Sequence, residues 1–129
     1  MEFIGHFILV GVLFLGIDAV WLSVVANKLY KSQIGELLLL KPKLGPAALF
    51  YVLYVIGIIV FALRPALDKG SFSYALSHGA LLGLLMYATY DLTNLSTLKK
   101  WKTKLVIVDM AWGTFVTGVV TTLAFLILN

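Results

Sequence analysis

The chain has 129 residues, of which 61% are hydrophobic and 12% charged, with a formal net charge of +4. A soluble domain has about 45–50% apolar and about 25% charged residues, and a chain this short cannot hide so much apolar surface in one core, so the composition excludes a water-soluble fold. The sequence contains no cysteine, which excludes disulfides and thiolate metal sites.

Four apolar stretches are long enough to cross a bilayer, because a hydrocarbon core about 30 Å thick needs roughly 20 helical residues. In chain order they cover about residues 3–26, 46–63, 72–90 and 105–128. Pro46 suits the first turn of the second stretch, and Ser71 can cap the third. Backbone polar groups in lipid must be satisfied within their own segment. We therefore expect residues 1–129 to form one all-α domain, an integral membrane four-helix bundle.

The basic residues predict how this bundle is oriented. Eight of the ten lie in the first and third connections, and the second connection contains only Arg64 and Lys69. The positive-inside rule places the lysine-rich connections in the cytoplasm, so both termini are expected on the non-cytoplasmic side. Neither a basic start nor a small-residue cleavage site marks the first stretch as a signal peptide. We expect a retained helix in a multi-pass protein of the bacterial inner (cytoplasmic) membrane.

The first connection contains a second apolar segment, "QIGELLLL" at residues 33–40. This segment is too short to span a bilayer. It fits a helix that lies in the membrane interface with lysines reaching the headgroups, and it fits equally an extension of the first helix followed by a turn.

Aspartates recur at one depth of the predicted bundle. Asp18 and Asp109 each stand three positions before a tryptophan, Trp21 and Trp112, and Asp91 lies at the end of the third stretch. With the orientation above, all three carboxyl groups lie toward the cytoplasmic side. A charged side chain at the centre of a membrane helix costs about 2.5–3.5 kcal/mol, so such residues usually face a bundle interior and are functional candidates.

Hydrogen-bonding and aromatic residues accompany these carboxyl groups at helical spacing. We therefore expect one ligand-binding or proton-handling site that comprises Asp18, Trp21, Tyr87, Tyr90, Asp91, Thr93, Asn94, Asp109 and Trp112. The alternative is a structural latch, in which a carboxyl group pairs with Lys28 or Lys102 and the tryptophans are interfacial anchors. Gly79 and Gly83 form a G-x-x-x-G pattern, which favours close helix packing within the bundle or between copies.

Several kinds of chemistry lack their motifs. The sequence has no phosphate-binding loop, no G-x-G-x-x-G and no H-E-x-x-H, nor the G-x-S-x-G of hydrolases. Two histidines are too few for a histidine-rich metal site. We assign no catalytic residue, no metal and no cofactor, and the sequence leans away from an enzyme. Anionic lipid accounts for the lysine clusters, so nucleic acid is not an expected partner.

Three motifs resemble those of a known family: "GIDAVWL" at 16–22, "YATYDLTNLSTLKKW" at 87–101 and "VDMAWGTF" at 108–115. With them the chain is similar, over essentially its whole length, to a family of small bacterial four-helix membrane proteins of unknown function. The resemblance implies an inner-membrane protein. It also implies membrane proteins of lipid metabolism as partners, because genes of this family sometimes neighbour those of lipid-modifying enzymes.

Three functions fit these residues. The first is binding of a lipid headgroup or other amphiphile in an acidic and aromatic pocket near the cytoplasmic leaflet, with membrane lipids as partners. The second is a small proton-coupled transporter, which implies a homo-oligomer because four helices need a second copy to enclose a pathway. The third is an intramembrane lipid-modifying enzyme with an aspartate as general acid or base.

Overall fold

The computed structural model describes residues 2–38 and 43–129, which form helices joined by short connections and contain no strand. The first helical rod is continuous through a π-helical turn, η1, and ends in a short 3-10 turn, η2. Its parts are α1 (Glu2–Trp21), η1 (Leu22–Ala26), α2 (Asn27–Ile34) and η2 (Gly35–Leu37). The first helix is thus extended beyond residue 26, as in the second interpretation of "QIGELLLL". Leu39, Leu40 and Lys41 lie outside the described residues.

The second rod also contains a π-helical turn. It consists of α3 (Leu44–Ile58), η3 (Ile59–Leu63) and α4 (Arg64–Lys69). Residues 64–69, which we expected in a connection, are therefore helical, and the rod is longer than the predicted 46–63. Pro65 lacks an N–H group and cannot bond the carbonyl group of the preceding turn. The widened turn η3 ends two residues before it, so the helix continues past the proline.

The turn after α4 has a glycine and a serine at the positions that require them. Gly70 adopts φ 59°, in the left-handed region, and Ser71 N–H bonds the carbonyl group of Ala66 at 3.0 Å, which closes the helix end. Ser71 Oγ then accepts a hydrogen bond from Tyr74 N–H at 3.0 Å, which confirms the predicted cap. The remaining long helices are α5 (Phe72–Thr97) and α6 (Thr103–Leu128).

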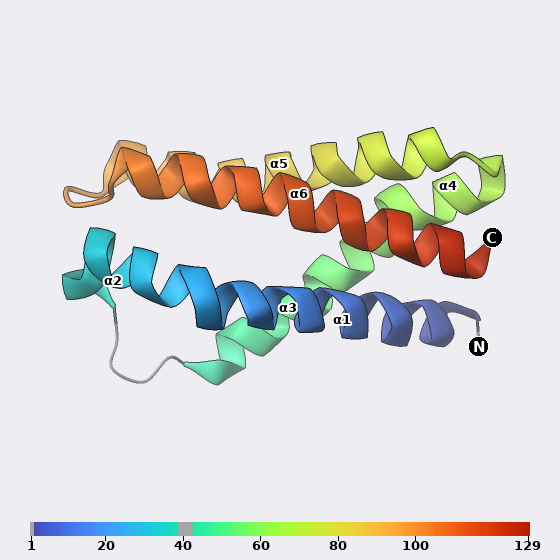
Figure 1. The fold of residues 1–129 in the computed structure, drawn as a ribbon, viewed down its shortest axis with the longest axis horizontal. Coiled ribbons are helices and arrows are strands. Elements are labelled where there is room, and N and C mark those ends of the chain that lie inside the picture. Colours follow the sequence, from blue (N-terminus) through green and yellow to red (C-terminus); the bar gives the residue numbers. More distant parts are fainter. Residues whose placement is uncertain (1, 39–42) are drawn as a thin grey trace.

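The rods pack side by side with alternating direction (Figure 1). α5 and α6 are antiparallel neighbours along most of their length, and α1 packs against both α6 and α3. The rod of α3 and α4 crosses the others obliquely, so that the first half of α3 diverges from the bundle. Both chain termini lie at the same end of the molecule (Figure 1).

A row of small residues lets α5 and α6 approach closely. We call Gly79, Gly83, Gly113, Thr117 and Thr121, all buried, the glycine seam. A Cβ atom added at Gly79 would lie 2.7 Å from Thr121 Oγ1, and one at Gly83 would clash with the carbonyl oxygen of Gly113. The G-x-x-x-G pattern therefore serves packing within the chain, where small residues permit short distances between helices.

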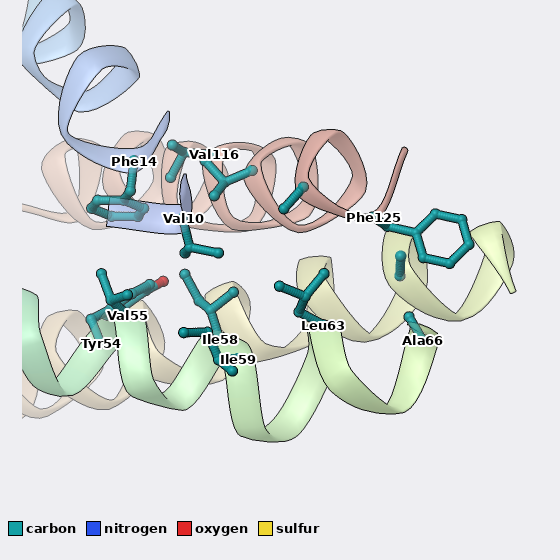
Figure 2. Close-up of a cluster of buried hydrophobic side chains, with 13 residues drawn as sticks. Val10, Phe14, Tyr54, Val55, Ile58, Ile59, Leu63, Ala66, Val116 and Phe125 are labelled. Carbon is teal, nitrogen blue, oxygen red and sulfur yellow. The ribbon is translucent and has the colours of Figure 1, made fainter. Parts of the chain in front are cut away.

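Apolar side chains fill the space between α1, α6 and the second rod (Figure 2). Val10 and Phe14 of α1 face Tyr54 and Ile58, and each of these four residues is at most 1% exposed. This cluster joins the oblique rod to the rest of the bundle, next to the polar residues described below.

Within the described part of the chain, three rods are long and apolar enough to cross a membrane: residues Glu2–Ile34, Leu44–Lys69 and Thr103–Leu128. α5 carries more polar side chains, since serines, tyrosines and threonines recur along it. That α5 is a fourth span, and that the termini lie outside the cytoplasm, stay predictions.

Candidate functional site

Asp18 lies on the buried face of α1, which also presents Val10 and Phe14 at spacings of four residues. It is 6% exposed. One carboxylate oxygen accepts a hydrogen bond from the Tyr51 hydroxyl at 2.5 Å, and the other accepts one from Trp112 Nε1 at 3.1 Å. Asp18 therefore connects three rods, because its donors belong to α3 and α6.

The two D-x-x-W motifs meet through their tryptophans. The rings of Trp21 and Trp112 stack with centroids 4.4 Å apart and planes 6° from parallel. Trp112 thus stacks on the tryptophan of the first motif and donates to its aspartate, Asp18. The recurrence of the motif in helices that pack together brings both tryptophans and both aspartates to one region of the bundle.

Asp109, which is 4% exposed, accepts a hydrogen bond from the Tyr30 hydroxyl at 2.5 Å. The π-helical turn η1 brings Tyr30 to this position. On a regular α-helix, Tyr30 would lie about 120° around the axis from Asp18, at about 100° per residue. A π turn accommodates one extra residue, which reduces the difference to about 20°, so both residues face α6.

Asp91 is fully buried and its carboxyl group lies against that of Asp109. No donor among the described residues bonds either oxygen of Asp91. The two residues end the glycine seam at the side where α5 and α6 connect, and we call them the carboxyl pair; Asp109 lines the cavity described below and Asp91 does not.

A cavity of about 550 Å³ lies beside these groups. Side chains from all four rods, namely the first rod, the second rod, α5 and α6, line it. Two of these side chains carry carboxyl groups, and more than half are aromatic. The lining residues are Asp18, Trp21, Leu22, Tyr30, Pro46, Ala47, Phe50, Tyr51, Met86, Tyr87, Tyr90, Asp109 and Trp112. Phe50 and Tyr90 are 45% and 57% exposed, so they lie where the cavity opens to the molecular surface.

The predicted site residues divide into two groups. Those that line the cavity are Asp18, Trp21, Tyr87, Tyr90, Asp109 and Trp112. Asp91 is behind Asp109, while Thr93 is exposed and Asn94 half-buried, and these three residues do not line the cavity. α5 continues as a helix to Thr97, so successive residues after Asp91 point in different directions and only some of them face the bundle.

Tyr30 and Tyr51, which donate to the two aspartates, were missing from the predicted site. A signal existed for Tyr51, because Tyr51 and Tyr54 are three residues apart in an apolar stretch and so share a helix face. Tyr54 is buried and its hydroxyl lies 2.5 Å from Thr117 Oγ1. Nothing in the sequence marked Tyr30, because its orientation depends on the π turn.

The contacts of the three aspartates bear on the alternative of a structural latch. Neither Lys28 nor Lys102 forms an ion pair with the three aspartates in the described part of the chain; the donors to Asp18 and Asp109 are tyrosine and tryptophan. The described residues also contain no group of three or more metal-ligating side chains. The arrangement can therefore accept hydrogen bonds, attract a cation or move a proton, and its ring faces can pack against apolar groups.

Comparison with known proteins identifies the family. A family of predicted membrane proteins, DUF2177, matches residues 3–126. The chain belongs to this family. Membership confirms the resemblance to a membrane-protein family of unknown function. No curated protein matches the chain, and no solved structure does.

Proposed function

We propose that this membrane protein holds the polar headgroup of a lipid or other amphiphile in the cavity. The observation that carries the proposal is the lining itself, in which carboxyl groups and aromatic rings from all four rods meet around about 550 Å³. Small-molecule sites typically enclose about 300–1,000 Å³ and combine apolar walls with a few placed polar groups.

The mouth of the cavity supports an amphiphile over a fully polar ligand. Leu22 and Phe50 line the cavity and are 44% and 45% exposed, so they offer apolar surface next to the acidic interior. A headgroup inside would leave its acyl chain along these side chains. If α5 is a fourth span, the cavity lies at the predicted cytoplasmic side of the bacterial inner membrane, at the level of that leaflet's headgroups.

Two adjacent alanines provide a test. Both alanines are exposed, but Ala47 lines the cavity and Ala48 does not. Ala47→Trp should fill the cavity without touching the hydrogen bonds of Asp18 or Asp109, and Ala48→Trp should add the same ring outside. After mild purification, native mass spectrometry should detect a retained amphiphile on the wild type and Ala48→Trp but not on Ala47→Trp. Equal retention by all three proteins would contradict the proposal.

A second candidate function, proton-coupled transport, is favoured by the carboxyl pair. Asp91 and Asp109 lie in contact in the interior, and a proton on either one could pass to a group in the cavity through Asp109. The test is flux of a cation into liposomes under an imposed pH gradient. Flux that persists when Asp18, Asp91 and Asp109 are all replaced by Asn would eliminate transport through this site.

A further inference from the structure

The charge of the cavity walls indicates which class of headgroup the cavity can hold. This inference rests on the proposed function. We infer that the headgroup carries an ammonium group. That group could belong to a diacyl lipid such as phosphatidylethanolamine or to a single-chain amine.

The first support is an imbalance of charge. Asp18 and Asp109 line the cavity, and none of the described lining residues is basic. The donors to the two aspartates are the hydroxyl groups of Tyr30 and Tyr51 and the indole N–H of Trp112. These neutral donors bond both oxygens of Asp18 and one oxygen of Asp109 without cancelling the carboxylate charge, and a carboxylate oxygen can accept a further bond. A cavity of this sign attracts a cation and repels an isolated phosphate.

The second support is the arrangement of aromatic rings beside the carboxyl groups. Trp21 and Trp112 form a stacked pair with centroids 4.4 Å apart, and Tyr51 and Tyr87 also line the cavity. The face of an aromatic ring attracts an ammonium group within about 6 Å, and aromatic cages recognise ammonium ligands in this way. Carboxylates and ring faces together therefore select a cation that also bears carbon groups.

The experiment is a competition on the full chain in a neutral maltoside detergent, read by native mass spectrometry. The probes are phosphatidylethanolamine, phosphatidylglycerol and diacylglycerol with identical acyl chains, together with dodecylamine. The ammonium probes should be bound at least about tenfold more tightly than phosphatidylglycerol, which corresponds to about 1.4 kcal/mol. Preference for phosphatidylethanolamine or for dodecylamine identifies the source of the ammonium group.

Two matched substitutions test whether the preference for ammonium headgroups depends on the charge of Asp18. Asp18→Asn removes the charge but keeps a side chain that can accept from Tyr51, and it should reduce the preference to about one to one. Asp68→Asn makes the same change at an exposed position of α4 and should leave the preference intact. Asp109→Asn serves as the second test if Asp18→Asn elutes as an aggregate.

The outcomes separate this inference from the proposed function. Retention of all headgroups with equal affinity, abolished by Ala47→Trp, would overturn the ammonium inference and leave the proposed function standing. Tighter binding of phosphatidylglycerol than of the amines would do the same. Binding that is insensitive to Ala47→Trp would overturn both.

Discussion

The two sides of the bundle are packed by different means. Between α5 and α6, small residues bring the helix backbones together, so that even a methyl group at Gly83 has no room. Between the first rod, α3 and α6, long aromatic side chains reach across by hydrogen bonds to Asp18 and Asp109, and a cavity of about 550 Å³ remains. Backbone contact leaves no space for a ligand, whereas bridging side chains can surround one. We call the first side, the α5–α6 pair with its glycine seam, the frame. The second side carries the candidate site.

The largest loss of stability is expected from adding a methyl group between α5 and α6. Gly83→Ala should cost about 3 kcal/mol, because its Cβ would meet backbone and a buried threonine, which cannot move away as a flexible side chain could. Unfolding in increasing denaturing detergent, followed by circular dichroism, measures the loss. The control is Gly16→Ala, whose Cβ would meet nothing within 4 Å. Equal stability of the two variants would show that the close approach is not part of the native packing.

The carboxyl pair tests whether Asp91 belongs to the frame or to the site. Asp91→Ala should lower the unfolding free energy by about 2 kcal/mol, because it leaves a void and deprives buried Asp109 of a neighbour. Asp91→Asn should retain most of the stability, since its amide can donate to Asp109. Both variants should keep the amphiphile, measured by native mass spectrometry, because Asp91 does not line the cavity. Loss of the amphiphile in Asp91→Asn would place this residue in the site.

Variants of two tyrosines of α3 distinguish an effect on stability from an effect on amphiphile binding. Tyr51→Phe and Tyr54→Phe each remove one hydroxyl group and should each cost about 1 kcal/mol. Tyr51 lines the cavity and donates to Asp18, so its loss should also weaken amphiphile retention, by about fivefold. Tyr54 contacts Thr117 in the interior and does not line the cavity, so its variant should retain the amphiphile like the wild type. The opposite ranking in a titrated competition would reverse the assignment of the two residues.

The smallest effect is expected from shortening the π turn. Deletion of Val24 should convert η1 into a regular α-helical turn while keeping Tyr30 on the face that meets Asp109, so stability should change by less than about 1 kcal/mol. Insertion of one alanine after Val24 should rotate Tyr30 by about 100° and remove its bond to Asp109. Thermal unfolding of the two variants compares them, and a deletion as harmful as the insertion would refute this role of the turn.

Much of the frame could be predicted from the sequence, because its pattern is local. Gly79 and Gly83 recur at a four-residue spacing, and so do Asp109, Gly113 and Thr117, and each set shares one face of a single helix. The extra helical turns around Pro65 could not be predicted in this way, since a proline usually ends a helix unless a wider turn accommodates it.

The site was less predictable, because its contacts join different rods. Asp18, Asp109 and both tryptophans of the D-x-x-W motifs were expected near one another, and they line one cavity. Tyr30 and Tyr51 were not expected there, and Asp91, which was expected in the site, is buried against Asp109 without lining the cavity. No spacing within one helix indicates which donor from another helix an aspartate accepts.

The sequence by itself determined a membrane protein made of helices, the residues that share each helix face, and the family to which the chain belongs. Hydrophobicity and helical period act within one segment, so one segment suffices to reveal them. Only the tertiary structure decided that Trp21 stacks on Trp112, that a π turn directs Tyr30 to Asp109, and that the oblique α3 leaves a cavity. These features depend on how the surfaces of separate helices fit together, and that fit is a property of the assembled bundle.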